Sequence, residues 1–482
     1  MFLFQKEATV KEFFYGKKAL GILVCLVAVL TTVAALANPT VIPTGTTLYN
    51  PQKSYNMYVL FGAPDGKSHL IDMNGNEVRR WEKSGFPTEM LDPAIMDGNK
   101  GHILVQLENG PSPYGGMFNN KSVGELDWNG KTVWRWDGEG GGGMAKQNHD
   151  LCRLPNGNTL LVTTKKHIVP GVSDKPITDQ SIVEVTPDGK IVWIWNAGDH
   201  IDEFGISAEG REQLRKMYAT VVPPGAGGFL TINDMQPIGP NKWFDSGDLR
   251  FDPENIVIDS REASFIAIIE KKTGKIVWRL GPDYPIPTVE IGGTAVVIDM
   301  NRPVPKTDLP RPIDQTSGQH DAHIIPKGLP GSGNLLVFDN ESPSGYPPTR
   351  LFSILGSRVL EIDPITKQIV WQYTALDSGA PSWDFFSSFI SSARRLPNGN
   401  TLICEGMNGR IFQVTSKGEI VWEYINPYFG QQFMIHPKHS VKTNWVFRAQ
   451  PVPYDWVPDE TPRSEKPVRR LDNSSFRVPS SQ

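Results

Sequence analysis

The stretch TPDGKIVWIW, residues 186–195, decides the fold because closely related phrases recur along the chain. Five further copies are DMNGNEVRRW from Asp72, DWNGKTVWRW from Asp127, KKTGKIVWRL from Lys271, DPITKQIVWQY from Asp363 and TSKGEIVWEY from Thr415. A short alternating strand, such as SIVEV or RVLEI, precedes each copy, and most copies carry an Asn-Gly, Asp-Gly or Thr-Gly turn. Each copy therefore predicts a β-hairpin, with its Val and Trp facing inward.

A second repeated phrase supplies the other strands. RLPNGNTLLV from Arg153 and RLPNGNTLIC from Arg395 are nearly identical, and NKGHILVQL and GSGNLLVF are weaker relatives. In each strong copy a Pro-Asn-Gly-Asn turn leads into a buried strand. Four strands repeated six times, with each sheet packed on its neighbours, predict an all-β, six-bladed β-propeller over residues 38–451.

The spacing of the repeats predicts where the propeller is interrupted. The interval widens between Thr186 and Lys271 and again between Lys271 and Asp363, which indicates long loop insertions in blades four and five. The first insertion contains FGISAEGREQLRKMYA, residues 204–219, the one stretch that we expect to be helical. Long insertions on a rigid scaffold usually carry function. The polar, Pro-rich tail over 452–482 is expected to be disordered.

The N-terminus has the pattern of an export signal. Lys17 and Lys18 precede an apolar stretch over 19–37 that ends in Ala-Leu-Ala, a small-x-small cleavage pattern. We expect residues 1–37 to be a cleaved signal peptide and the mature protein to be periplasmic or secreted. The alternative is an uncleaved membrane anchor over residues 19–37, since a largely apolar stretch of 19 residues is long enough to span a bilayer.

Charge and cysteine content limit the partners. The formal net charge is −4, and the sequence has no long basic run, so nucleic acid is a poor partner. Cys152 and Cys404 remain after processing, and the sequence is compatible with either a single disulfide or two buried free thiols.

A zinc site at His320 and His323 is disfavoured, because positions i and i+3 on a strand face opposite sides. We expect no metal and no cofactor.

Two of the nine histidines occupy the same place in the repeat. His149 follows a Gly run and His320 follows a Pro-rich insertion, and each lies just before a second-strand phrase. Equivalent positions of a propeller meet at one end of the central channel, so we expect both side chains at its mouth. For either histidine alone, a hydrogen-bonded structural role would be the default.

From about Thr40 to Pro458 the chain resembles the bacterial arylsulfate sulfotransferase family. The resemblance is carried by PTGTTLYNPQKSYNMYVLF, NHDLCRLPNGNTLL, ENIVIDSREASFIAIIEKKTGKIVWRLGP, GQHDAHIIPKG with LLVFDNE, RLPNGNTLICEG and VPYDWVP. Members of this family are secreted six-bladed propellers. They move a sulfuryl group from an aryl sulfate to a phenol through a histidine intermediate, without a nucleotide-activated sulfate.

The resemblance assigns roles to particular residues. It implies that His320 is the nucleophile, that His149 is a second active-site histidine and that Arg261 holds sulfuryl oxygens. The family's His-x-Asn motif has its best counterpart at Thr231-Ile232-Asn233, where the asparagine is kept and Thr231 replaces the histidine.

These residue types suit sulfuryl transfer. A neutral imidazole attacks sulfur, and a guanidinium fork matches sulfate oxygens. We expect His149 to protonate the departing phenolate and Asp321 to orient His320. Thr231, Asn233 and Asp321 complete the expected substrate contacts. Without the resemblance, an ion pair with Glu262 or Asp259 would be the preferred interpretation of Arg261.

The function predicted from the sequence is therefore an exported enzyme that transfers a sulfuryl group from an aryl sulfate to a phenol. The alternative is a non-catalytic propeller that binds a ligand or a protein partner, which the replacement at Thr231 favours. A quinone-dependent dehydrogenase is a weaker third interpretation, because the sequence has neither a vicinal Cys pair nor a calcium-ligand cluster. Paired carboxylates for glycoside hydrolysis also remain open.

Overall fold

The computed structural model divides the chain into two compact units, residues 1–43 and 44–482. The described residues are 43–110, 120–140, 143–219, 228–282, 288–291, 294–297, 316–346, 356–432 and 441–470. The expected signal peptide or anchor over 1–37 lies outside them. Among the described residues, none of the helices is both long and apolar enough to cross a membrane.

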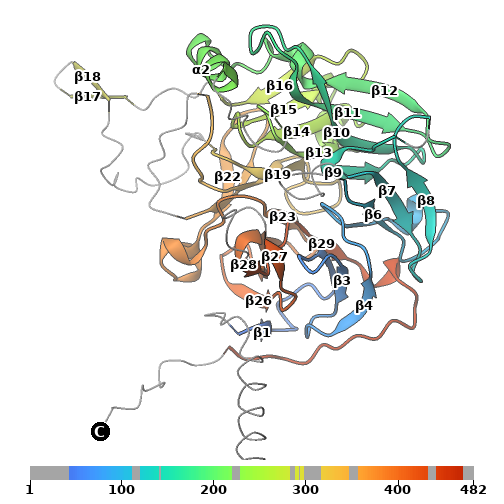
Figure 1. Ribbon diagram of the computed structural model, residues 1–482. Helices are drawn as coiled ribbons and strands as arrows, with labels where there is room; N and C mark the ends of the chain where they lie inside the picture. The colour runs from blue at the N-terminus through green and yellow to red at the C-terminus, as the bar shows by residue number, and fades with distance from the viewer. Residues whose placement is uncertain are drawn as a thin grey trace, which may run out of the picture. The chain divides into compact units, whose positions relative to one another are not determined.

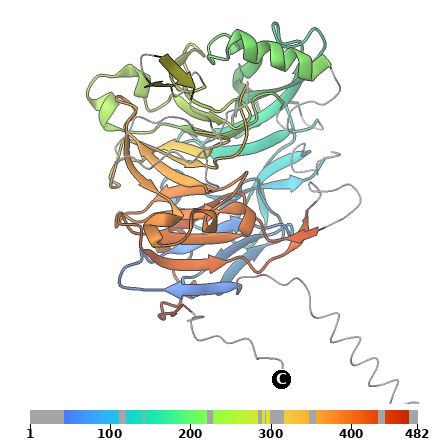
Figure 2. The same ribbon diagram turned by 90° about the vertical axis from the view of Figure 1, so that its left-hand side faces the viewer.

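The second unit is a six-bladed β-propeller. Its blades follow one another in chain order around a central axis, as the sequence of colours in Figure 1 shows, and Figure 2 shows the ring from the side. In order from the channel outward, blade one contains β29 (Ala449–Val452), β2 (Tyr58–Gly62), β3 (Ser68–Ile71) and β4 (Glu77–Trp81). Blade two contains β5 (Glu89–Met90), β6 (Ile103–Glu108), β7 (Ser122–Leu126) and β8 (Thr132–Trp136). Blade three contains β9 (Gln147–Arg153), β10 (Thr159–His167), β11 (Ile177–Val185) and β12 (Ile191–Asn196).

The other three blades repeat this order. Blade four contains β13 (Ile232–Pro237), β14 (Ile256–Ser260), β15 (Phe265–Ile269) and β16 (Ile276–Leu280). Blade five contains β19 (His320–Ile324), β20 (Leu335–Asp339), β21 (Arg358–Ile362) and β22 (Ile369–Tyr373). Blade six contains β23 (Ser392–Arg395), β24 (Thr401–Glu405), β25 (Arg410–Val414), β26 (Ile420–Ile425) and, outermost, β1 (Gly45–Tyr49). The predicted fold class is therefore confirmed.

Both ends of the unit close the ring. β29, near the C-terminus, is the innermost strand of blade one, and β1, from the N-terminal side, pairs with β26 of blade six. The chain beyond β29 also packs on the propeller. Tyr58 donates a hydrogen bond to the Thr461 carbonyl at 2.9 Å, and Val468 forms a β-bridge with Tyr49. Residues 453–470 thus differ from the expected disordered tail, and residues 471–482 lie outside the described part of the chain.

The repeated tryptophans explain why the phrase recurs. In every blade an indole N–H of the outer strand donates to a turn carbonyl of the next blade, and Trp422 of blade six donates to Met73 of blade one at 2.7 Å. The other five bonds join Trp81 to Asp127, Trp136 to Gly189, Trp195 to Gly274, Trp278 to Pro364 and Trp371 to Ser416. Each indole also buries apolar surface between blades, so the repeat encodes contacts between blades as well as hairpins.

The prediction that the Val of each phrase faces inward is wrong for three copies. The side chains of Val133, Val192 and Val370 are 47%, 56% and 53% exposed, whereas Trp195, three residues after Val192, is 2% exposed. Side chains of a strand alternate between its two faces. The aromatic residue that ends the phrase takes the buried face, which leaves the opposite face of the outer strand to Val.

The insertions predicted before the inner strands of blades four and five are only partly described. The first contains η3 (Ala197–His200) and the helix α2 (Ala208–Ala219), which confirms the predicted helix with a later start. The second contains the hairpin β17 (Thr288–Ile291) and β18 (Thr294–Val297). The remaining elements are α3 (Lys242–Asp245), β27 (Gly430–Gln432), β28 (Val441–Thr443), η1 (Pro93–Ile95), η4 (Leu249–Phe251), η5 (Ala375–Ser378), η6 (Ser382–Asp384), η7 (Gly406–Asn408) and η8 (Tyr454–Trp456). Cys152 and Cys404 are free, buried thiols.

Candidate active site

The inner strands place one polar residue from each blade in a layer across the channel, which we call the ion-pair layer. Hydrogen bonds between inner strands of neighbouring blades keep these residues level with one another. Asp150 Oδ2 accepts from the Met235 amide at 2.9 Å, and Asp321 Oδ2 accepts from the Ala393 amide at 3.0 Å. Ser392 accepts in the same way from the Ala449 amide. The layer contains Glu89, Asp150, Asp234, Asp321, Ser392 and Arg448.

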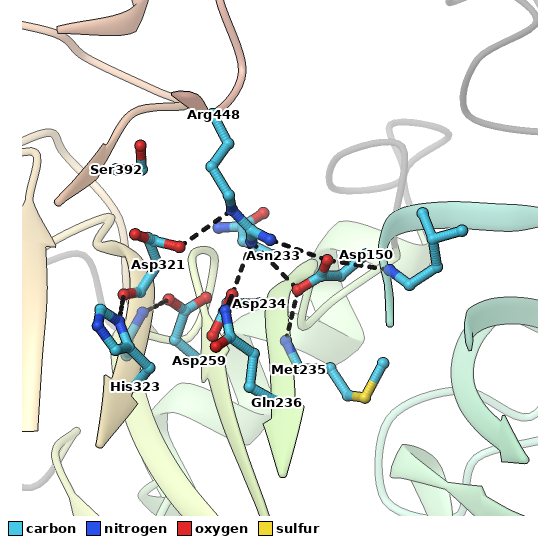
Figure 3. A network of polar contacts seen from close by, with 12 residues as sticks. Asp150, Asn233, Asp234, Met235, Gln236, Asp259, Asp321, His323, Ser392 and Arg448 are labelled. Atoms are coloured by element: carbon cyan, nitrogen blue, oxygen red, sulfur yellow. Dashed lines mark hydrogen bonds and ion pairs between the residues drawn. The ribbon is translucent and has the colours of Figure 1, made fainter. Parts of the chain in front are cut away.

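Arg448 holds this layer together, as Figure 3 shows. Its guanidinium lies between the carboxylates of Asp321 and Asp150, with N–O distances of 3.0 Å to each, and reaches Asp234 at 2.6 Å. Burial raises the pKa of Asp234 and of Asp259, the residue opposite it on β14, well above the ordinary value, while Arg448 lowers both. The ion pairs with Arg448 offset part of the cost of burying the carboxyl groups of Asp150, Asp234 and Asp321.

The two candidate histidines lie just before the ion-pair layer, at the N-terminal ends of their inner strands. His149 is 6% exposed and His320 is 3% exposed, and both rings pack on Phe447, with centroid distances of 6.1 and 6.4 Å. The two rings are close enough for protonation of His149 to lower the pKa of His320. The structure therefore brings the two histidines together at one end of the channel.

Hydrogen bonds define the tautomer of His320. Asn340 donates its amide hydrogens to the carbonyls of Ser387 and Ile390 at 2.7 and 2.9 Å, so its Oδ1 is free to accept. That Oδ1 lies 2.7 Å from His320 Nδ1, which therefore carries the proton. Nε2 presents its lone pair and accepts the Ile390 amide at 3.0 Å.

Burial keeps both imidazoles neutral. Burial and, after it, the positive charge of Arg261 together lower the pKa of His320 and of His149 to about 3. A neutral His320 has the lone pair that a nucleophile needs. His149, by contrast, does not carry the imidazolium proton that the expected role as general acid to the phenolate requires, because its charged form is desolvated and repelled by Arg261.

Arg261 lies at the same end of the propeller, in the turn between β14 and β15. Its amide donates to the Thr231 carbonyl at 3.1 Å, which ties the turn to the start of blade four. The guanidinium pairs with Glu262 at 2.7 Å and donates to the Ser388 carbonyl at 3.4 Å. Nε is buried and has no acceptor among the described residues. Arg261 is thus ion-paired, as the alternative interpretation held, and its charge reaches both histidines, while one of its donors has no acceptor among the described residues.

The other three predicted residues have different surroundings. Asn233 occupies the position in blade four that His149 and His320 occupy in theirs, and it donates to the Gln319 carbonyl at 3.3 Å. The Thr231 hydroxyl donates to the Gly228 carbonyl and so supports the turn beside Arg261. The expectation that Asp321 orients His320 is wrong, because Asp321 belongs to the ion-pair layer and the orienting bond comes from Asn340.

A comparison with protein families decides the relationship. The family model described as Arylsulfotransferase (ASST) matches residues 56–448, which is most of the chain and includes every predicted site residue. The chain belongs to the arylsulfotransferase family. No relative was found among curated proteins.

Solved structures similar to this arylsulfotransferase-family chain are distant. A Bacteroides caccae protein of unknown function is 12% identical, with a TM-score of 0.42, and the match covers 83% of this chain and 99% of that one. The propeller domain of Cps50 (Swd1) from Myceliophteria thermophila is 10% identical, with a TM-score of 0.38 and coverage of 82% and 90%. The Dos1 propeller is 9% identical, with a TM-score of 0.34 and coverage of 84% and 82%.

Three contacts in this arylsulfotransferase-family site were not predicted. Asn340 lies in the FDN phrase that carries the resemblance, so a signal for it was present without a role. The Ile390 amide and Arg448 have no sequence signal, since neither belongs to a repeated phrase. Among the described residues, no group of three or more His, Cys, Asp or Glu side chains is arranged to hold a metal ion.

Proposed function

We propose that this member of the arylsulfotransferase family is an exported enzyme that transfers a sulfuryl group from an aryl sulfate to a phenol, with His320 as the covalent nucleophile. The observation that carries the proposal is the state of His320: its ring is neutral, its Nδ1 proton is held by Asn340, and its Nε2 is an acceptor on a ring whose pKa Arg261 and His149 both affect. Export rests on the pattern of residues 1–37.

In the first half of the reaction, the Nε2 lone pair attacks sulfur, and the bond between sulfur and the aryl oxygen breaks. The phenolate leaves with the electron pair, and the sulfuryl group stays on Nε2. Positive charge then develops on the ring, and the hydrogen bond from Nδ1 to Asn340 stabilises it. Arg261 Nε supplies a donor to the sulfuryl oxygens.

In the second half, the acceptor phenol attacks the same sulfur, and the nitrogen–sulfur bond breaks to restore neutral His320. The phenol proton passes through His149, whose ring lies beside the reacting group, to solvent. Since His149 enters the first half neutral, the donor phenolate departs without a full proton. Donors with acidic phenols are therefore expected to react fastest.

The proposal is tested by assaying the purified mature protein with 4-nitrophenyl sulfate and phenol. Release of nitrophenol that requires phenol, together with formation of phenyl sulfate, supports transfer. Acid-sensitive sulfuryl modification of the peptide that contains His320, detected after a quench without acceptor, supports the covalent step. Absence of turnover with a series of aryl sulfates would leave a ligand-binding propeller as the function.

The pH dependence follows from the state of His320. A free imidazole loses reactivity below its ordinary pKa of about 6.5, because protonation removes the lone pair. With a folded pKa of about 3, the expected kcat/KM shows no fall between pH 8 and pH 5 that is due to His320.

The variant Asn340→Asp is the matched comparison for this pH profile. A carboxylate beside Nδ1 favours the imidazolium form of His320. The fall of kcat/KM at acid pH should therefore move up toward neutral pH, while the position of the His320 ring stays similar. Initial rates from pH 4.5 to 8.5 measure both profiles. A wild-type limb near pH 6.5 would contradict the assignment.

One observation favours the binding alternative. The Ile390 amide occupies the Nε2 lone pair, and the backbone of Ile390 and Ser391 has φ values of 54° and 100°, a region in which a β-branched residue is strained. In this conformation His320 is a structural acceptor. Attack on sulfur therefore requires the segment Ser388–Ser391, which also contacts Arg261, to move aside.

A further inference from the structure

The described part of the propeller contains a recess at the end of the channel opposite the histidines. Its volume is about 700 Å³, and its lining includes the residues that follow the ion-pair layer on the inner strands. Among the described residues, Asp150 and Arg448 line it, whereas His149 and His320 do not. Glu89, Asp150 and Arg448, three members of the ion-pair layer, thus form the floor of this recess, and the layer separates it from the candidate active site.

The wall of the recess is largely apolar. Seven prolines contribute to it together with Leu329 and Trp456. Such a wall suits the hydrocarbon or aromatic part of a small molecule, and a few polar groups on the floor then fix its orientation.

The positive groups on the floor are already paired. Arg448 binds three carboxylates, and Arg394 binds Asp321 and donates to Gln236. Arg153 and Arg395 pair with Glu125 and Glu361 and stack on Trp134 and Trp371. A bound anion would have to compete with these carboxylates.

The polar groups of the recess that still lack a hydrogen-bond partner are acceptors. The side-chain carboxyl of Glu89, the member of the ion-pair layer from blade two, has no hydrogen bond or ion pair to any described residue, and its backbone pairs with Leu104 of β6. His323 is 3% exposed and donates from Nδ1 to the Asp321 carbonyl at 2.9 Å, so its Nε2 carries a lone pair with no partner in the described chain. Blades two and five lie on opposite sides of a six-bladed ring, so these acceptors face the recess from opposite walls.

From these observations we infer that the recess is a binding site for a small organic ammonium ion, with the ammonium group at Glu89 and the apolar body against the prolines and Trp456. The site is distinct from the sulfuryl-transfer site and does not depend on that proposed function. An ammonium ion is the partner that the floor lacks, because Glu89 is the one carboxyl group of the ion-pair layer without an arginine partner, whereas the other three share Arg448.

Electrostatics at Glu89 agree with this assignment. Burial raises the pKa of Glu89 to about 8, and the negative charge of Asp150 adds to the rise, while Arg448, Arg394 and Arg153 oppose it. At pH 7 the empty site therefore holds a protonated carboxyl. Binding of an ammonium ion stabilises the carboxylate and releases that proton.

The test uses the purified full-length protein and three probes that share one body: phenethylamine, phenylacetate and 2-phenylethanol. Calorimetry at pH 7 is expected to show binding of phenethylamine in preference to the other two. In two buffers of different ionisation enthalpy, the heats should show proton release. Glu89→Gln is expected to lower the affinity for phenethylamine by about tenfold or more and to remove the proton release.

Asp92→Asn is the matched control, since Asp92 also lines the recess but caps η1 by accepting from the Ala94 amide. It should leave the affinity unchanged. The comparison of the three probes on the wild-type protein tests the inference even if a variant fails to fold. Preferential binding of phenylacetate, or equal weakening by Asp92→Asn and Glu89→Gln, would overturn the inference, as would no binding of phenethylamine up to its solubility.

Discussion

His320→Ala is expected to abolish phenol-dependent release of nitrophenol from 4-nitrophenyl sulfate, with a loss in kcat of about 10⁴-fold or more. The substitution removes the atom that forms the covalent bond, and the neighbouring His149 cannot take its place, because it is held in another blade. Steady-state assays of the wild type and the variant measure the effect.

Two comparisons separate loss of the nucleophile from loss of structure. His200→Ala removes an imidazole from the outer wall, where His200 stacks on Trp195, and is expected to keep full activity. In His320→Gly, added imidazole can occupy the vacated space and restore part of the transfer to phenol. Activity of His320→Ala within tenfold of the wild type would exclude His320 as the nucleophile.

Arg448→Met is expected to destabilise the folded state by about 3–5 kcal/mol at neutral pH, the range found when one partner of a buried ion pair is removed. The change leaves the carboxylates of Asp150, Asp234 and Asp321 in the channel without their shared cation. Urea unfolding followed by tryptophan fluorescence measures the loss. Arg250→Met, at the exposed pair with Asp248, is the matched control and should cost less than about 1 kcal/mol.

The sign of the pH dependence is part of this prediction. The pKa values of Asp234 and Asp259 are already raised in the folded protein, and Arg448 lowers them, so its loss raises them further. A carboxyl whose pKa is higher folded than unfolded contributes stability at low pH and loses it as the pH rises through the folded value. The difference in the free energy of unfolding between wild type and Arg448→Met should therefore be smaller at pH 5 than at pH 7.5. An equal difference at both pH values would show that the destabilisation comes from lost packing and not from the charge of Arg448.

The sequence predicted the blades well because each hairpin is a local unit with its own turn and alternation. It also placed His149 and His320 at one end of the channel, because their repeat positions match. It did not predict that Asn233 occupies in blade four the position that the two histidines occupy in their blades. That position depends on the register of inner strands that carry bulges. Asn340 and Arg448 act across blades far apart in the chain, and contacts of that kind leave no local pattern.

The ring closure affects how the molecule is made. β29 spans Ala449–Val452, so blade one lacks its inner strand until synthesis has passed these residues and they have left the ribosome. Until then β2 presents an unpaired edge, which is a hazard for association with other chains. Loss of the last few dozen residues, by an early stop codon or by proteolysis, would remove both that strand and Arg448, which lies one residue before it. The C-terminal region is therefore as necessary to the first blade as the residues beside it in the chain.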